Sequence, residues 1–103
     1  MSVRTDVSKE VVTAYIEGEI DHHSAKAIRE GIDAAIKHNS PSLLVLDFKD
    51  VTFMDSSGIG LVMGRYKALQ SLGAELHVVN TSPHIYKVMN LAGLSRLAKI
   101  DKG

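Results

Sequence analysis

A polar cluster at residues 55–57 has the residue types of a phosphate acceptor. Asp55 is followed directly by Ser56 and Ser57, within the stretch FMDSSGIGLVMGRYK that spans residues 53–67. The start of the helix predicted there has unpaired N–H groups and a positive dipole end, so it tolerates a phosphate. One serine can cap the helix, which is worth about 1 kcal/mol, and the other is then free to carry chemistry. The residues alone leave open which serine is modified.

A phosphoryl group at this position would concentrate negative charge. It adds a charge of about −1.5 to −2 at pH 7. Asp55 is adjacent, and Asp21 is predicted to lie at the same edge of the fold. Phosphorylation can therefore leave the fold intact and still repel a partner.

Two glycines lie inside the helix that follows the serines. Gly60 and Gly64 are four residues apart, and each costs about 1 kcal/mol against alanine in a helix interior. On a helical wheel centred on Val62, both glycines and Lys67 fall on the side opposite the apolar residues. We expect a bare outward strip on which another chain can lie, with Met63 beside it as an adaptable apolar contact. The alternative is that the glycines are merely tolerated. The predicted buried side comprises Ile59, Val62, Tyr66 and Leu69, with Leu61 and Leu72 at its margin.

Motifs for other chemistries are absent or incomplete. MDSSG lacks the leading glycine of a G-x-S-x-G nucleophile elbow. The P-loop pattern is absent, and the glycines of GIGLVMG miss the G-x-G-x-x-G spacing. Asp21, His22 and His23 could suggest a metal, but adjacent residues at a helix start rarely converge on one ion. We therefore expect no metal site, no bound cofactor and no enzyme active site.

Length and composition exclude further classes of protein. The chain has 103 residues, 12 basic and 12 acidic side chains, and no cysteine. This length predicts a single domain over residues 1–103. A nucleic-acid-binding protein carries a basic patch, so a net charge of zero disfavours direct binding to nucleic acid. The polar start MSVRTDVSKE is neither a signal peptide nor a membrane span, so we expect a cytoplasmic protein with no membrane partner.

The elements that must position these residues follow from the hydrophobic pattern. Residues 3–20 predict a hairpin, residues 42–48 a central strand covered on both faces, and residues 74–80 another strand. Residues 50–55 are interpreted as a connection, and residues 94–100 as a final strand.

Three helices are predicted between these strands. The first lies within residues 21–41, with Asp21 or Ser24 as its cap and an unexplained Gly31 inside it. The second spans about residues 57–72, and the third starts at Ser82 and Pro83 and ends before residue 93. The buried face of the first helix is predicted to comprise Ala25, Ile28, Ile32, Ala35 and Ile36.

This alternation predicts an α/β fold, with a mixed, mostly parallel sheet and an N-terminal β-hairpin. Loops that follow parallel strands gather at one edge of the sheet, where ligands and partners usually approach. We therefore expect residues 18–24, 50–57 and 80–83 to meet there.

The segments GEIDHHSA, FMDSSGIGLVMGRYK and TSPHIYKVMNLAGL together resemble the anti-sigma factor antagonists of the STAS-domain superfamily. The similarity is greatest to the sporulation sigma-F branch and covers the chain from about Val3 to Ile100. It implies a single STAS domain. Members commonly continue into a C-terminal helix, and we expect that helix to be absent here, whether naturally or by trimming, because the chain stops at AKIDKG.

The resemblance also implies a mechanism. In the family, the unphosphorylated antagonist binds an anti-sigma factor that is also a serine kinase, and this frees the sigma factor. The kinase uses its own bound ATP to phosphorylate the serine after the motif aspartate, which is Ser56 here, and a PP2C-type phosphatase reverses this. The resemblance places Asp21 on the docking surface. Together with the residues singled out above, the predicted partner surface comprises Asp21, His22, Asp55, Ser57, Gly58, Gly60, Met63, Gly64 and Lys67.

Two alternatives within the superfamily stay open at this point. The domain could itself bind a nucleotide or small ligand, or it could be a scaffold subunit of a large signalling complex. The free protein is expected to be a monomer, which argues against the scaffold.

Overall fold

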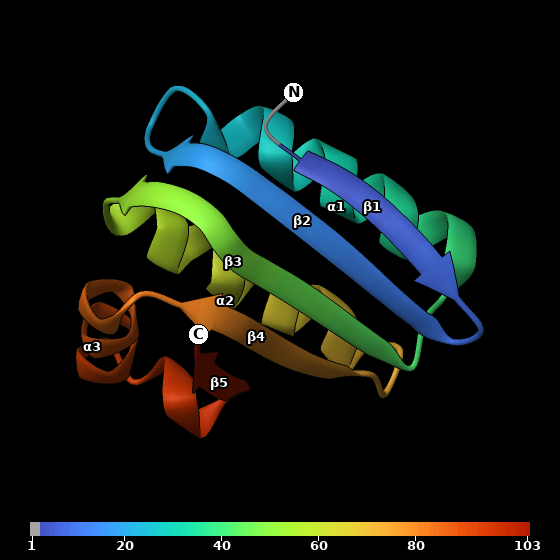
Figure 1. Ribbon diagram of the computed structural model, residues 1–103. Coiled ribbons are helices and arrows are strands. Elements are labelled where there is room, and N and C mark those ends of the chain that lie inside the picture. The colour runs from blue at the N-terminus through green and yellow to red at the C-terminus, as the bar shows by residue number, and fades with distance from the viewer. Residues whose placement is uncertain (1–2) are drawn as a thin grey trace.

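Strands and helices alternate along the chain and build a five-stranded mixed sheet (Figure 1). The computed structural model describes residues 3–103. The sheet order is β1-β2-β3-β4-β5; β1 is antiparallel to β2, and the other neighbours are parallel. The predicted α/β fold with an N-terminal hairpin and three α-helices is thus confirmed. The elements are β1 (Val3–Ser8), β2 (Val11–Ile20), α1 (Ala25–Asn39), β3 (Leu43–Met54), α2 (Ser56–Gln70), β4 (Glu75–Thr81), α3 (Pro83–Leu91), the 3-10 helix η1 (Leu94–Arg96) and β5 (Lys99–Lys102).

Helices α1 and α2 lie side by side behind the sheet in Figure 1, and α3 lies beside its β4–β5 edge. The apolar face predicted for α1 is confirmed at Ile28, Ile32, Ala35 and Ile36, which are all buried, whereas Ala25, which was also predicted, is only half-buried. The core therefore lies between these two helices and the sheet. The inner face of the sheet contributes residues such as Ile16, Leu46 and Val78.

Strand β3 differs from its prediction in two ways. It continues to Met54, so the interpretation of residues 50–55 as a connection was wrong. Its side chains also alternate: Leu44, Leu46 and Phe48 are buried, whereas the residues between them are only half-buried. The expectation of a strand covered on both faces was therefore wrong, because α1 and α2 cover only the face behind the sheet (Figure 1).

The last part of β3 escaped prediction because its pairing with β2 is irregular. The register shifts between Tyr15 and Glu17 and again between Gly18 and Glu19. Each shift interrupts the alternation of a regular strand, so the sequence there has no period of two. Pairing nevertheless resumes at the end of both strands, where Ile20 lies opposite Met54.

Helix α2 is rotated relative to its predicted orientation. Its own buried residues are Gly58, Leu61, Val62, Arg65 and Leu69. The predicted members Ile59 and Tyr66 are only partly buried, and Leu72 is 45% exposed. The buried face was assigned to the wrong side of the helical wheel because a charged residue, Arg65, belongs to it.

The end of the chain is also less regular than predicted. Ser82 caps α3 by accepting a hydrogen bond from the backbone N–H of Ile85 at 3.2 Å, as expected for its start. The segment 94–100 was predicted as one strand, but its first part forms η1 and only Lys99–Lys102 forms β5. Leu94 is buried in this irregular segment, so it belongs to the core without belonging to a strand.

Candidate functional site

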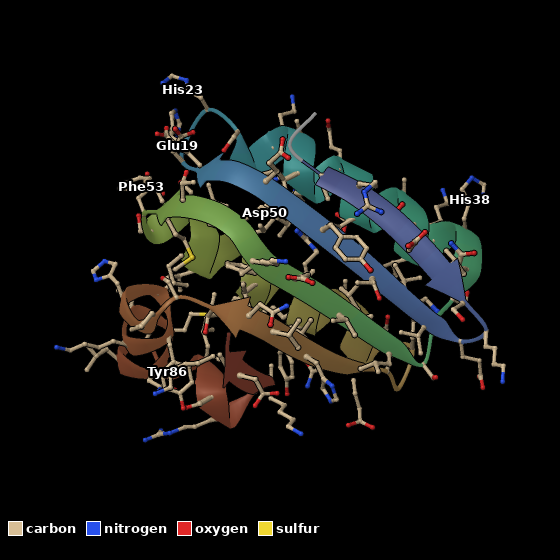
Figure 2. The ribbon with its side chains drawn as sticks, in the orientation of Figure 1. Glu19, His23, His38, Asp50, Phe53 and Tyr86 are labelled. Atoms are coloured by element: carbon tan, nitrogen blue, oxygen red, sulfur yellow. The ribbon has the colours of Figure 1, made fainter. Side chains whose placement is uncertain are left out.

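Two loops that are far apart in the sequence meet where β2 and β3 end. Asp21 and Asp55 directly follow the opposed residues Ile20 and Met54. The backbone N–H of Asp55 donates a hydrogen bond to the carbonyl oxygen of Ile20 at 3.1 Å. Residues 21–24 and 55–57 are therefore held together, and we call them the paired loops. Figure 2 shows Glu19, His23 and Phe53 gathered at this end of the sheet.

The first of the paired loops is closed by its own hydrogen bonds. Oδ1 of Asp21 accepts from the backbone N–H groups of His23 and Ser24, both at 2.9 Å. The Ser24 hydroxyl donates to the carbonyl oxygen of Glu19 at 2.6 Å and accepts from the Asp21 N–H at 3.0 Å. Ser24 occupies the cap position of α1, but its side chain caps no helix N–H, so Asp21 organises this turn.

These hydrogen bonds also affect the ionisation of Asp21. The backbone N–H of Ser24, and more weakly that of His23, lower the pKa of the Asp21 carboxyl, because they stabilise its charged form. The carboxylate is therefore part of the loop's structure as well as an exposed negative charge.

The second of the paired loops leaves its hydroxyls available. The cap of α2 is Asp55, whose Oδ1 accepts from the N–H of Ser57 at 2.8 Å. The expectation that a serine caps this helix was therefore wrong, and both serines lie in its first turn. Ser56 is exposed and Ser57 is half-buried. Within residues 3–103, neither hydroxyl takes part in a side-chain hydrogen bond.

Gly58 has a structural role that the sequence did not suggest. It is buried beneath the first turn of α2, where a Cβ atom would overlap the side chain of Met54 and lie 3.5 Å from Cγ2 of Ile20. Only glycine lets the helix start this close to the ends of both strands. Its inclusion in the partner surface is therefore corrected: Gly58 faces the core.

The outward strip of α2 is bare. Gly60 is exposed and Gly64 is half-buried, and a Cβ atom built on either would meet nothing within 4 Å. Met63 is 37% exposed and Lys67 is exposed, as expected for residues on or beside the outward side of α2. His22 is also exposed, at the paired loops.

A hollow of about 360 Å³ lies between α1 and α2 beside this strip. We call it the interhelix hollow. It is lined by Ala25, Arg29, Ser57, Gly60, Leu61, Gly64 and Arg65. The two glycines thus form part of its wall, and Ser57 connects it to the paired loops.

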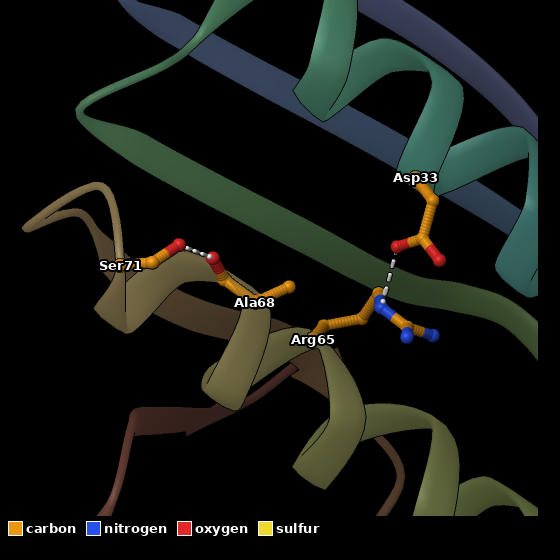
Figure 3. Close-up of polar contacts among 4 residues, drawn as sticks. All are labelled: Asp33, Arg65, Ala68 and Ser71. Carbon is orange, nitrogen blue, oxygen red and sulfur yellow. Dashed lines mark hydrogen bonds and ion pairs between the residues drawn. The ribbon is translucent and has the colours of Figure 1, made fainter.

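Sequence reasoning missed an ion pair next to this hollow and an exposed aromatic ring. Figure 3 shows Arg65 reaching from α2 to Asp33 on α1, with Nε of the guanidinium 2.8 Å from Oδ1 of the carboxylate. The sequence analysis assigned no role to Arg65, and only its position on the buried side of α2 could have indicated one. Phe53, which is 48% exposed, was missed because its segment was interpreted as a connection.

The histidines next to Asp21 form no metal centre. The rings of His22 and His23 pack edge to face, with their centroids 5.4 Å apart. Among the described residues there is no group of three His, Cys, Asp or Glu side chains that could hold a metal ion. In the same part of the chain, residues 3–103, no helix has the length and apolar character needed to cross a membrane.

Comparisons with known proteins agree with this architecture. The family model described as "STAS domain" matches residues 2–102. An anti-sigma F factor antagonist from Paenibacillus polymyxa is 31% identical over 97% of this chain and 86% of its own. One from Lysinibacillus sphaericus is 38% identical over 85% of this chain and 75% of its own.

Solved structures of the anti-sigma factor antagonist SpoIIAA are also similar. Its unphosphorylated form superposes with a TM-score of 0.77 and 30% identity, covering 98% of this chain and 88% of that one. Its phosphorylated form, from Bacillus, superposes with a TM-score of 0.75 and 33% identity, covering 95% and 89%. The chain therefore belongs to the STAS-domain family and, within it, to the anti-sigma factor antagonists.

Proposed function

We propose that the unphosphorylated protein binds an anti-sigma factor that is also a serine kinase, and that phosphorylation of Ser56 ends this binding. The observation that carries the proposal is the Asp55 cap, which leaves the exposed Ser56 hydroxyl without a structural task at the start of α2. A relative of known structure exists in an unphosphorylated and a phosphorylated form, which supports a modified state here too.

The proposed surface has two parts with different properties. The paired loops carry the carboxylates of Asp21 and Asp55, and the outward strip of α2 offers bare backbone at Gly60 and Gly64. Bare backbone lets a partner chain come close. A phosphoryl group on Ser56 would add a charge of about −1.5 to −2 to two existing carboxylates at the edge of that contact.

The remaining components of the switch belong to other proteins in this proposal. The anti-sigma kinase binds the ATP, so this chain needs no cofactor of its own. A PP2C-type phosphatase removes the phosphate and restores binding. The protein is thus a regulatory binding module, not an enzyme, and we expect it to be a monomer in the cytoplasm when free.

The test is phosphate transfer from candidate anti-sigma kinases. Wild type, Ser56→Ala and Ser57→Ala would be incubated with each kinase and ATP, and the modified residue mapped by mass spectrometry. We expect labelling of wild type and Ser57→Ala at Ser56 and a complete loss in Ser56→Ala. Circular dichroism of the three proteins should coincide, because Asp55 holds the cap in all of them.

Two results would contradict the proposal. Undiminished labelling of Ser56→Ala would exclude Ser56 as the acceptor. Tight binding of ATP or GTP to the isolated protein, with no labelling by any anti-sigma kinase, would favour a ligand-binding STAS domain instead.

A further inference from the structure

Arg65 is a buried cation with two side-chain nitrogens, Nε and Nη1, that form no hydrogen bond within residues 3–103. The residue is only 6% exposed, and its Nη1 atom is buried without a hydrogen-bond partner. The contact between Nε and Asp33 is close enough for an ion pair, but it lacks the alignment of a hydrogen bond. A buried guanidinium normally has its donors satisfied, because an unpaired one costs free energy.

The charges around the interhelix hollow do not balance. Arg29 and Arg65 both line it, and Asp33 is the carboxylate in contact with Arg65. Burial lowers the pKa of Arg65, Asp33 partly offsets this, and the nearby Arg29 lowers it further. Among residues 3–103, Arg65 has Asp33 as its ion-pair partner and Arg29 has none, so the lining carries one positive charge more than this pair balances.

The hollow is open to a partner from the side of the glycine strip. A Cβ at Gly60 or Gly64 would meet nothing within 4 Å, and both residues line the hollow together with the two arginines. A side chain of a neighbouring protein can therefore pass over the bare backbone to the exposed Arg29 and to the part of Arg65 that lines the hollow, although Nε and Nη1 of Arg65 are themselves buried.

We propose that the interhelix hollow receives an aspartate or glutamate side chain of the protein partner, whose carboxylate pairs with Arg29 and Arg65. This inference rests on the proposed function and names a contact within it. A single carboxylate balances the one unpaired positive charge, whereas a phosphate dianion would exceed it and would lie close to Asp33. Planar guanidinium groups are also suited to bidentate contacts with carboxylates.

The contact links the hollow to the phosphorylation site. Ser57 lines the hollow, and Ser56 is its neighbour in the first turn of α2. A phosphoryl group on Ser56 would compete with the partner's carboxylate for the same positive charge. Loss of this ion pair would then add to direct repulsion when the protein is modified.

The test uses full-length variants and the anti-sigma kinase that labels wild type, with affinities measured by calorimetry. Arg29→Gln removes an exposed guanidinium from the hollow, and we expect it to weaken binding about tenfold. Asp33→Asn removes the internal competitor for Arg65, and we expect binding about two- to threefold tighter. Lys37→Gln, an exposed site in the last turn of α1, removes one charge away from the hollow and should leave affinity unchanged.

The opposite signs expected for Arg29→Gln and Asp33→Asn separate this contact from a structural effect, which would weaken binding in both. Thermal unfolding of each free variant checks that the fold is intact. Normal binding of Arg29→Gln, in an experiment where wild type binds, would overturn the carboxylate contact alone. If wild type binds no anti-sigma kinase, the proposed function fails and this contact fails with it.

A charge exchange locates the partner's residue. Arg29→Glu should bind poorly, and one Asp→Lys or Glu→Lys change in the kinase should restore binding to Arg29→Glu while weakening binding to wild type. Failure of every acidic position in the kinase to give this rescue would contradict a carboxylate in the hollow.

Discussion

Helices α1 and α2 have similar residues at their starts and interiors, but other parts of the chain cover these residues in α1 and leave them uncovered in α2. Each has 15 residues, packs on the same face of the sheet and has an aspartate and a serine at or just before its start. At α1, contacts within the chain occupy both the serine and the glycine. The Ser24 hydroxyl donates a hydrogen bond to the Glu19 carbonyl oxygen, and Val3 fills the space beside Gly31. In α2 the Ser56 hydroxyl is exposed and the space beside Gly64 is empty.

The comparison shows that residue type alone does not decide a role. A serine at a helix start or a glycine inside a helix is structural where the chain covers it. The same residue is available for a partner where nothing covers it. The unexplained Gly31 thus has a physical reason, since a Cβ there would lie 2.8 Å from Cγ1 of Val3.

The largest effect is expected from a permanent negative charge at the open helix start. Ser56→Asp should weaken binding to the anti-sigma kinase about tenfold or more, because like charges across an interface are strongly unfavourable. Calorimetry measures the affinity. Ser95→Asp adds the same charge at an exposed site in η1 and so controls for a general effect of one more negative charge. Equal affinities of Ser56→Asp and wild type would remove the repulsion argument.

The cap of α2 should matter next. Asp55→Ala removes the acceptor for the Ser57 N–H, so the free energy of unfolding should fall by about 1 kcal/mol. Asp55→Asn should be nearly neutral, since asparagine caps equally well. Urea denaturation measures both. A loss as large in Asp55→Asn as in Asp55→Ala would show that charge, not capping, is the main contribution.

The two glycines should respond in opposite directions to the same substitution. Gly64→Ala should raise the free energy of unfolding by about 0.5–1 kcal/mol, because alanine is the better helix former and space is free. Gly31→Ala should lower it by a similar amount, about 0.5–1 kcal/mol, because overpacking against Val3 outweighs helix propensity. Urea denaturation compares the two.

A double variant checks the cause assigned to Gly31. Gly31→Ala combined with Val3→Ala removes the close contact, so the two changes should cost less together than the sum of their separate effects. Simple additivity would mean that the Gly31–Val3 approach is not what limits this position.

The smallest effect concerns the closed loop and its pH dependence. The pKa of Asp21 is lowered in the fold, so its carboxylate contributes stability above its ordinary value of 3.8. That contribution is lost as the pH falls through the lowered value. The stability difference between wild type and Asp21→Asn should therefore be present at neutral pH and disappear in acid. NMR titration of the Asp21 carboxyl would give its pKa, and thermal unfolding from neutral to acidic pH would follow the stability difference. An Asp21 pKa at or above 3.8 would contradict this prediction.

The sequence predicted the elements well where their apolar residues follow one period. The buried face of α1 was recovered because Ile28, Ile32 and Ile36 recur at helical spacing, and the start of α3 because Ser82 and Pro83 are strong local signals. The end of β3 was missed because β3 has one extra residue relative to β2 at each register shift, and this removes the alternation on which strand prediction depends.

The site was predicted less completely, and the reason is tertiary packing. Asp55 and Ser56 were recognised from their types, but the assignment of the cap to Asp55 depends on a side-chain geometry that a sequence does not specify. Arg65 was missed because a charge is expected on the surface, and its burial requires Asp33, which lies on a different helix.

The Asp55 cap has a consequence for repeated modification of Ser56. Because an aspartate one position earlier holds the first turn of α2, attaching or removing a group at Ser56 breaks no bond on which the helix depends. In the proposed switch, neither a kinase nor a phosphatase would have to unfold the start of α2 to reach Ser56. If the proposal holds, one molecule could be modified and restored repeatedly without loss of its folded structure.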